Sequence, residues 1–277
     1  MKNQWSHSVK MAVFCAVAGA LGGIASEKKP ETTITEQFLP PIPQDKAWRL
    51  TWSDEFNGTK IDQSKWEVLG DWKRRDGYWV KEDAYLDSKG NLIIRTKKAG
   101  DRYTSGAVRT KGKFDHKFGY WVCRSKFPTQ QGHWPAFWLH IGTVNKVGNQ
   151  GRDGTEIDIM EKPWREDKIT QNLHWDGYGK DHKSLGTDRI YVEPTKDGWL
   201  VAGLLWEPGK FAWYCSGRKV GHWASERIPD VPLFLKLTMQ MGGWGGNRIV
   251  DGELPDVFRV DYVRAWQRAN LVGPGTR

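Results

Sequence analysis

Residues 156–161 read Glu156-Ile157-Asp158-Ile159-Met160-Glu161, three carboxylates interleaved with three apolar residues. This pattern is typical of a β-strand with one apolar and one acidic face, because successive side chains of a strand point to opposite sides. Like charges this close repel and raise one another's pKa. A hydrolase that works with two carboxylates needs such crowding, since one acid must hold a proton while the other stays ionised. An exposed edge strand with scattered acids is the alternative, and the stretch alone leaves both open.

The spacing of the three acids makes a further structural prediction. Glu156 and Asp158 are two apart and share a face of a regular strand, whereas Glu161 stands at an odd offset and points the other way. One inserted residue, a β-bulge near Ile159-Met160, would return Glu161 to the acidic face. The two glutamates would then be about 13 Å apart at Cα on a straight strand. Long side chains and strand curvature can narrow this to the ~5–5.5 Å between carboxyls of a retaining glycosidase.

Short apolar or alternating runs separated by turn residues recur on both sides of this stretch. The clearest of these runs are 91–96, 119–127, 136–141, 156–161, 169–175, 200–206, 211–216, 234–240 and 258–267. No stretch shows a sustained 3.6-residue period with caps, so we expect little helix. Many short strands within roughly 220 residues predict one all-β domain, a sandwich or a barrel.

The N-terminal residues resemble a targeting segment rather than part of the fold. Lys2 and Lys10 precede the apolar run Met11–Ile24, which is too short to span a bilayer and rich in small residues. This predicts a secretory signal peptide and a secreted protein, extracellular or periplasmic. A lipoprotein anchor at Cys15 is the weaker alternative, because Phe14 stands where a small residue is expected. No other apolar run could cross a membrane, so we expect no membrane insertion.

Composition divides the chain into four parts. Proline recurs between the apolar run and Asp45, which predicts an extended linker. The expected parts are a signal peptide at 1–25, a Pro-rich linker at 26–45, a catalytic domain at 46–268 and a tail at 269–277.

Charge and cysteine content narrow the function classes. The formal net charge is +9, but Lys and Arg are spread along the chain without a block of five or six, so we expect no nucleic-acid partner. Attraction to an acidic glycan or an anionic wall remains open beside a merely soluble basic surface. Beyond the signal segment only Cys123 and Cys215 remain, and either a disulfide or two buried thiols fits their apolar surroundings.

Tryptophan is unusually frequent, with seventeen in the chain. Several stand among polar and glycine residues, namely Trp72, Trp79, Trp134, Trp175, Trp223 and Trp244. Flat aromatic faces in a polar groove suit the apolar faces of sugar rings.

The chain resembles a known family. Glu156–Glu161 is similar to the Glu-x-Asp-x-x-Glu signature of glycoside hydrolase family 16, in the bulged form of its laminarinase/agarase-like branch rather than the unbulged Glu-x-Asp-x-Glu form. Further segments resemble family landmarks in order and spacing, over about Trp48 to Gln267. They are 50–58 (LTWSDEFNG), 103–106 (YTSG), 118–121 (FGYW), 132–139 (GHWPAFWL), 242–246 (GGWGG) and 260–264 (VDYVR).

The resemblance implies a β-jelly-roll sandwich of two curved antiparallel sheets with a concave substrate cleft. It implies Glu156 as nucleophile, Glu161 as general acid/base and Asp158 as the assisting carboxylate, with no cofactor required. Asp261 is similar to a calcium ligand on the convex side of many members, which implies a possible structural calcium. The reaction implied is endo-hydrolysis of a β-linked polysaccharide with retention of configuration.

Five further residues are candidates for substrate binding. Trp134 and Trp138 share a strand face by their even offset, either as sugar platforms or as core. We expect His174 to bond a sugar hydroxyl or Glu161, unless it is a structural histidine. Glycine pairs flank Trp244 and leave its ring free to stack on a sugar. Arg109 follows the 103–106 landmark and would reach substrate, unless it forms a surface salt bridge.

The substrate is the most open expectation. The bulged signature favours β-1,3-glucan or mixed β-1,3/1,4-glucan, while the basic charge suits a sulfated algal galactan, with agarose, porphyran and carrageenan as the galactan alternatives. A non-catalytic carbohydrate-binding protein is the alternative of another class, although such relatives usually lack the acids. We expect a monomer whose partner is the polysaccharide.

Overall fold

The computed structural model of the chain describes residues 48–246 and 248–271. Within these residues the backbone forms twenty β-strands and five short 3₁₀ helices, in line with the expected all-β class. The expected signal peptide, the linker and residues 272–277 of the expected tail lie outside the described residues. The first three residues of that tail form a turn of 3₁₀ helix directly after the last strand.

The strands form two sheets, and their bounds are as follows. The first, of eleven strands, holds β1 (Trp48–Asp54), β3 (Trp72–Arg74), β4 (Gly77–Trp79), β5 (Ala84–Leu86), β6 (Leu92–Ala99), β7 (Arg102–Ser105), β10 (Gly119–Lys126), β16 (Trp199–Glu207), β17 (Lys210–Cys215), β18 (Arg218–Ala224) and β20 (Asp256–Arg268). The second, of nine, holds β2 (Glu67–Val68), β8 (Ala107–Arg109), β9 (Asp115–His116), β11 (His133–His140), β12 (Glu156–Glu161), β13 (Lys168–Trp175), β14 (Lys183–Gly186), β15 (Ile190–Tyr191) and β19 (Leu233–Met241). The 3₁₀ helices are η1 (Lys81–Asp83), η2 (Asn149–Gly151), η3 (Gly243–Gly245), η4 (Asp251–Glu253) and η5 (Ala269–Leu271).

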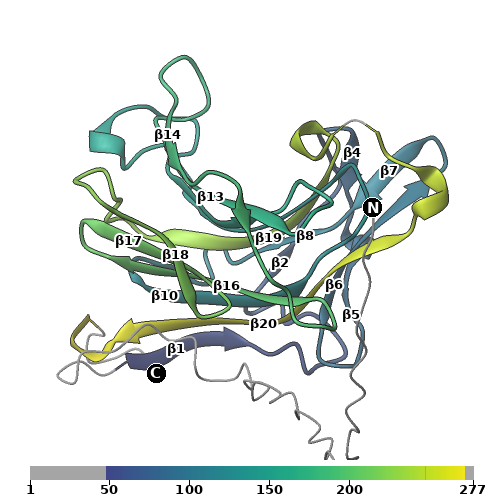
Figure 1. The fold of residues 1–277 in the computed structure, drawn as a ribbon, viewed down its shortest axis with the longest axis horizontal. Helices are drawn as coiled ribbons and strands as arrows, with labels where there is room; N and C mark the ends of the chain where they lie inside the picture. Colours follow the sequence, from purple (N-terminus) through teal and green to yellow (C-terminus); the bar gives the residue numbers. More distant parts are fainter. Residues whose placement is uncertain (1–47, 247, 272–277) are drawn as a thin grey trace, which may run out of the picture. The chain divides into compact units, whose positions relative to one another are not determined.

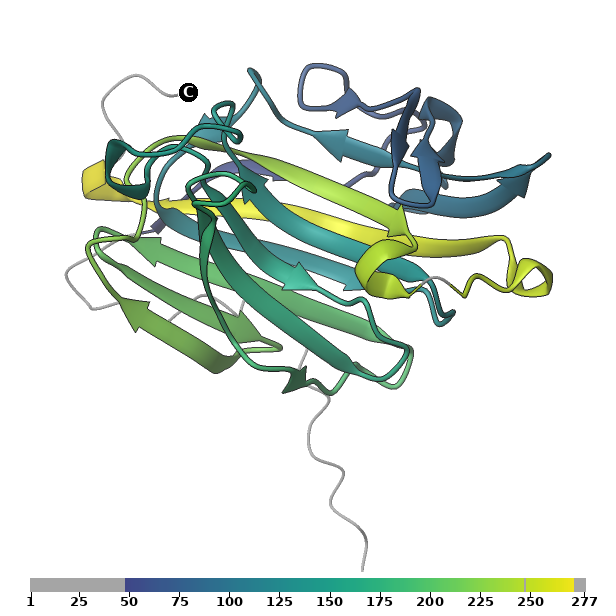
Figure 2. The ribbon, with the colours of Figure 1, turned by 90° about the horizontal axis from the view of Figure 1, so that it is seen from above.

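The two sheets are stacked face to face. The nine-stranded sheet runs β14-β13-β12-β11-β19-β8-β2, and the eleven-stranded sheet runs β18-β17-β16-β10-β20-β6-β7-β4-β3. Figure 1 shows the layer of β13 and β19 above that of β10 and β20, and Figure 2 shows the same layers from above. The pairings between named strands are antiparallel as expected, except that β4 runs parallel to β7.

The space between the sheets is filled by apolar side chains. Trp121, Trp206 and Trp213 are among the largest fully buried residues and come from the outer, eleven-stranded sheet. Ile157, Ile159 and Met160 of β12 and alternate residues of β19 meet them from the other side in one core cluster. Burial of this apolar area drives the association of the two sheets.

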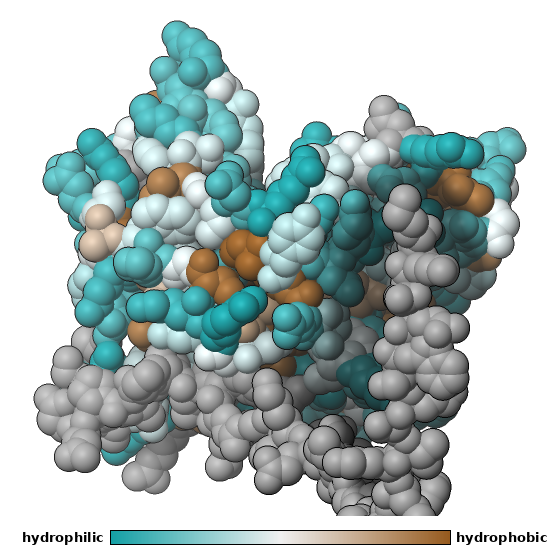
Figure 3. Space-filling model, in the orientation of Figure 1, coloured by the Kyte–Doolittle hydropathy of each residue, from teal (hydrophilic) through white to brown (hydrophobic). Residues whose placement is uncertain are grey.

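Cys123 and Cys215 are both free and buried in this core, so the thiol alternative describes them. On the other face of the nine-stranded sheet the molecule is hollowed. Figure 3 shows the hollow at the top of the domain, between the arm that carries β14 and the arm that carries β4 and β7.

Candidate active site

The hollow contains a cleft of about 470 Å³, within the size range of ligand-binding sites. Its floor comes from β11, β12, β13 and β19, while the β3–β4 hairpin and the loop after β13 form opposite walls. The cleft is lined by Arg74, Arg75, Trp134, Ala136, Trp138, Glu156, Asp158, Glu161, Asn172, His174, Tyr178, Gln240 and Trp244.

The expected β-bulge is present in β12, which confirms the prediction from spacing. Against β11, Glu161 pairs with Ala136 and Asp158 pairs with Trp138, so two residues of β12, Ile159 and Met160, oppose the single residue Phe137 of β11. The same register shift appears against β13. Both residues between Asp158 and Glu161 are buried in the core, and all three acids therefore open into the cleft.

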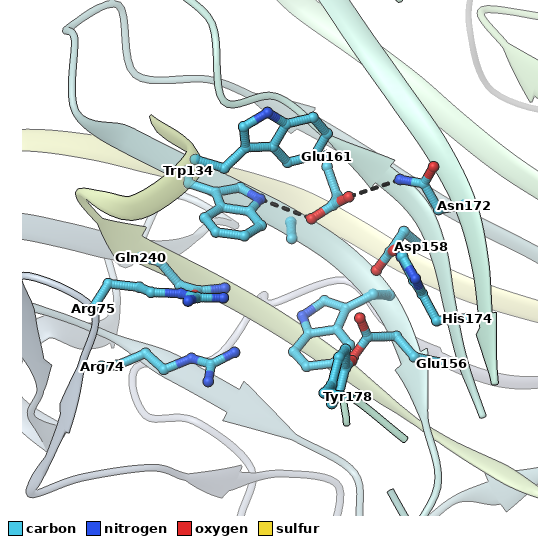
Figure 4. Close-up of a pocket in the computed structure, with 13 residues that line it drawn as sticks. Arg74, Arg75, Trp134, Glu156, Asp158, Glu161, Asn172, His174, Tyr178 and Gln240 are labelled. Atoms are coloured by element: carbon cyan, nitrogen blue, oxygen red, sulfur yellow. Dashed lines mark hydrogen bonds and ion pairs between the residues drawn. The ribbon is translucent and has the colours of Figure 1, made fainter. Parts of the chain in front are cut away.

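Each acid is held by its own neighbours (Figure 4). Glu161 accepts hydrogen bonds at both oxygens, from Trp134 Nε1 at 2.8 Å and Asn172 Nδ2 at 3.0 Å. Such bonds fix the carboxyl group in the cleft and favour its ionised form.

The other two acids form a tight cluster with a histidine. One ligating atom from each of Glu156, Asp158 and His174 lies within 4.8 Å of the others. His174 Nε2 is 3.1 Å from Asp158 Oδ2, although the geometry there is not that of a hydrogen bond, so the contact is electrostatic. The phenol of Tyr178 also acts on Glu156 and favours the ionised form of that carboxyl group.

The surroundings separate the three acids by proton affinity. Burial, followed by the charges of Asp158 and Glu156, raises the pKa of Glu161 well above its usual range. Burial and the neighbouring Glu156 do the same to the pKa of Asp158. Burial also raises the pKa of Glu156, but a Tyr178 hydrogen bond and the charges of His174, Lys236 and Arg74 oppose it. Glu156 is thus the acid best stabilised as an anion, and the surroundings of Glu161 favour its protonated form.

A buried lysine, Lys236 of β19, lies beside this cluster and pairs with Trp138 of β11. Lys236 Nζ lies 3.8 Å from the ring centroid of Trp138, and the residue is only 7% exposed. Burial lowers the pKa of Lys236 to about 7, while Glu156 acts to raise it. His140 Nε2 is 3.7 Å from Glu156, but burial and the nearby cations, Lys236 first, lower the pKa of His140 to about 2. The imidazole is therefore neutral and forms no ion pair with Glu156.

Four of the five residues expected to bind substrate line the cleft. Trp134 and Trp138 do so from one face of β11, as their even offset predicted. Trp244, on η3, is 45% exposed and meets Trp134 edge to face at 5.6 Å between centroids. His174 lines the cleft too, but it contacts Asp158 and lies 3.0 Å from His182 Nε2, rather than bonding to Glu161.

Arg109, the fifth of these residues, forms a salt bridge instead. Its guanidinium donates to both carboxylate oxygens of Glu67, at 2.7 and 2.9 Å, on the neighbouring strand β2. Arg109 does not line the cleft. The salt-bridge alternative therefore describes this residue.

Asp261 does not fit the expected calcium site. Its carboxylate pairs with Arg124 at 2.6 Å, so a guanidinium already occupies the position that a cation would need. In the part of the chain that the structure describes, the only cluster of three metal-binding side chains is that of Glu156, Asp158 and His174. Calcium binding was an expectation from the resemblance alone, and the residues at Asp261 do not support it.

Several residues that line the cleft were not predicted from the sequence. Asn172 is two residues before His174 on β13 and shares its face, so parity alone could have found it. Arg74 is the last residue of β3, and Arg75 is the first residue of the turn that follows it. The dipeptide Asp76-Gly77 directly after them is a sequence signal for a hairpin. Nothing in the sequence placed that hairpin beside the acids.

Comparison with known proteins decides the family. The family model described as glycosyl hydrolases family 16 matches residues 73–264, more than half of the chain. The chain belongs to glycoside hydrolase family 16. Both the membership and the bulged branch expected from Glu156–Glu161 are thereby confirmed.

Relatives within family 16 carry different substrate names. The chain is 27% identical to glucan endo-1,3-beta-glucosidase A1 of Niallia circulans over 88% of its own length, yet this covers 42% of that longer protein. It is 30% identical to a beta-glucanase of Rhodothermus marinus (80% of this chain, 87% of that protein). It is also 30% identical to beta-porphyranase B of Zobellia galactanivorans (80% and 85%).

A solved structure of the family supports the fold. The endo-beta-1,3-glucanase from Pyrococcus furiosus superposes with a TM-score of 0.68 at 27% identity, covering 82% of this chain and 97% of that one. The expected jelly roll of two stacked sheets is confirmed.

Proposed function

We propose that this chain hydrolyses internal β-glycosidic bonds of a polysaccharide and retains the configuration at the anomeric carbon. The observation that carries the proposal is the bulge in β12, which opens Glu156 and Glu161 into one cleft. Their surroundings favour a proton on Glu161 and an anion at Glu156. Those are the two protonation states that a retaining glycosidase needs before it reacts.

The reaction follows from these states. Glu161 donates its proton to the glycosidic oxygen, while a carboxylate oxygen of Glu156 forms a bond to the anomeric carbon and the leaving sugar departs. Glu161, now ionised, takes a proton from water, and the hydroxide displaces Glu156 from the same face that the leaving group occupied. Trp134 and Asn172 stabilise the ionised form of Glu161 by hydrogen bonding to it between the two steps.

Aromatic side chains continue the cleft away from the acids. Trp134, Trp244 and Trp164 contact one another in sequence, with ring centroids 5.6 and 5.2 Å apart. Such rings stack on the apolar faces of successive sugars. An open cleft of this kind suits attack within a chain rather than at its end.

The names of the relatives support β-1,3-glucan or mixed β-1,3/1,4-glucan as the first candidate substrate. A sulfated galactan is the second candidate. It is supported by the relative named as a porphyranase and by Arg74 and Arg75, which are two cations in the cleft wall.

Glu156→Gln tests the catalytic assignment. We expect hydrolysis to fall by at least 1,000-fold, on the order of what nucleophile loss costs, while glycan binding persists. Glu226→Gln, at a highly exposed glutamate, is the matched control. Product sizing on laminarin, lichenan, agarose, porphyran and carrageenan would identify the substrate, and the anomeric proton signals of the first products would report retention. Binding without products from the unaltered chain would favour a non-catalytic carbohydrate-binding protein.

We also propose that the chain is exported and acts as a monomer. The basic, apolar and small-residue pattern of 1–25 supports export. N-terminal sequencing of protein from the culture medium or periplasm tests it, with a new terminus near Ser26 expected. Within the described residues no helix is long and apolar enough to cross a membrane. Light scattering after size exclusion tests the monomer.

A further inference from the structure

Two arginines face the catalytic acids across the cleft. Arg74 ends β3, Arg75 follows it, and both line the cleft with Glu156 and Glu161. Figure 4 shows the two guanidinium groups side by side, pointing towards the acids from the opposite wall. Neither arginine has a carboxylate within 4.0 Å among the residues that the structure describes. Arg74 Nε is buried and has no hydrogen-bond partner there.

The backbone holds these arginines in place. β3 and β4 are joined by the two-residue turn Arg75-Asp76. Arg75 has a φ of 60°, in the left-handed region that residues other than glycine rarely adopt. Asp76 N donates to Met241 O at 3.0 Å, which ties the turn to the end of β19. A Cβ on Gly242 would overlap the Asp76 side chain, so only glycine permits this close approach.

The side chain of Arg75 is positioned further by the cleft floor. Its Nε donates to Gln240 Oε1 at 3.3 Å, and its Cζ lies 5.3 Å from the ring centroid of Trp134. Gln240 and Trp134 are themselves paired across β19 and β11. The hydrogen bond uses Nε and leaves the two terminal nitrogens of Arg75 available to a ligand.

The catalytic acids balance these two positive charges only in part. Burial raises the pKa of Asp158 and of Glu161 well above the usual range, so both favour the neutral form. Glu156 is shared by the charges of His174, Lys236 and Arg74, and Arg75 adds a further positive charge next to Arg74. Burial, and next the like charge of Arg75, lower the pKa of Arg74, so the pair is held together against its own repulsion. Two adjacent cations with no carboxylate in contact are costly to desolvate, and an anion between them would relieve that cost.

We propose that Arg74 and Arg75, steadied by Gln240 and Trp134, form a subsite for an anionic group carried by the substrate, a sulfate ester or a carboxylate on a sugar bound beside the catalytic acids. A guanidinium fork matches the oxygen geometry of either group and binds it with two parallel hydrogen bonds. The inference rests on the proposed hydrolysis and narrows its substrate to a charged glycan. It therefore favours the sulfated galactan over a neutral glucan.

The test compares substrates that differ only in charge, using the full chain. One pair is porphyran and the same porphyran after chemical desulfation, and the other is β-1,3-glucan and its C6-oxidised uronate form. We expect the unaltered enzyme to show a kcat/KM at least 10-fold higher on the charged member of one pair. Which pair responds tells sulfate from carboxylate recognition.

Variants then assign the effect to the two arginines. Arg75→Gln should lower kcat/KM on the charged glycan about 10- to 100-fold, the usual range for a lost hydrogen bond to a charged group, and change it less than about 3-fold on the neutral one. Arg74→Gln should lower kcat/KM on the charged glycan as well, but the Arg74 charge also favours ionised Glu156, so the comparison with the neutral glycan is made with Arg75→Gln. Lys73→Gln removes the same charge from the neighbouring, exposed position of β3 and should leave both values unchanged. Arg75 is exposed, so its variant carries the test even where Arg74→Gln does not fold.

The outcomes separate this inference from the proposed function. Equal rates on charged and neutral members, or equal losses on both in Arg75→Gln, would overturn the subsite while leaving hydrolysis intact. An enzyme that cuts neither these four glycans nor lichenan, agarose or carrageenan would overturn the proposed hydrolysis, and the subsite with it. Added salt should raise KM for the charged glycan alone, because exposed ionic contacts are screened.

Discussion

Replacing Lys236 with methionine should stabilise the fold near neutral pH and shift the activity profile. The ammonium is buried against Trp138, and burial lowers the pKa of Lys236 from 10.5 to about 7. A fall of that size corresponds to roughly 5 kcal/mol as an upper limit on the cost of keeping the group charged in the fold. Methionine keeps most of the side-chain length and removes that cost.

The sign of the pH dependence follows from proton binding. Between about pH 7 and pH 10.5 the unfolded chain carries the Lys236 proton and the folded chain does not, so the stability of the unaltered protein rises with pH across this window. Below pH 7 both states are protonated and the full cost is present. The advantage of Lys236→Met is therefore largest below pH 7 and shrinks as pH approaches 10.

The same substitution removes a cation that favours ionised Glu156. The pKa of Glu156 should rise further, and the acid limb of kcat/KM should move to higher pH. Urea unfolding at pH 6 and pH 9, together with the pH profile of kcat/KM, measures both effects. Lys73→Met is the control at an exposed lysine. An equal stability change at both pH values, together with an unmoved acid limb, would refute the reasoning.

Two further predictions concern other contacts of the cleft. Trp134→Phe removes a hydrogen-bond donor from Glu161, so the pKa of Glu161 should rise. The alkaline limb of the pH profile of kcat/KM should then move to higher pH, and a move to lower pH would contradict this prediction. Gly242→Ala should cost about 2 kcal/mol or more in urea unfolding, because its φ is positive and the new Cβ overlaps Asp76. Gly100 also has a positive φ, but a Cβ added there would meet nothing within 4 Å, so Gly100→Ala should cost only about 1 kcal/mol. An equal loss of stability at both glycines would show that the Asp76 contact is unimportant.

Features that depend on strand parity could be predicted from the sequence. The odd offset of Glu161 required a bulge, and the even offset of Trp134 and Trp138 placed both rings on one face, which the structure shows to be the cleft face. These predictions succeed because the alternation of side chains is a local property of any strand. The same rule applied to His174 would have added Asn172.

Features that depend on long-range packing could not be predicted. Trp79 and Trp244 both stand near glycine in the sequence, yet Trp79 is 2% exposed and Trp244 lies open in the cleft. Arg109 finds its partner Glu67 on another strand, so no local pattern reveals the pairing. Arg74 and Arg75 reach the acids only because their hairpin docks on the end of β19. Side-chain type is local information, whereas the partner of a side chain is set by topology.

The bulge in β12 also defines a mutational path between the two forms of the family signature. Ile159 and Met160 both point into the core, so deleting either one leaves a Glu-x-Asp-x-Glu strand whose last acid stands at an even offset and still faces the cleft. Loss of Ile157 instead would turn Glu156 out of the cleft, away from the other two acids. A lineage can therefore gain or lose a residue after Asp158 and sacrifice only core packing, while the alignment of the acids survives.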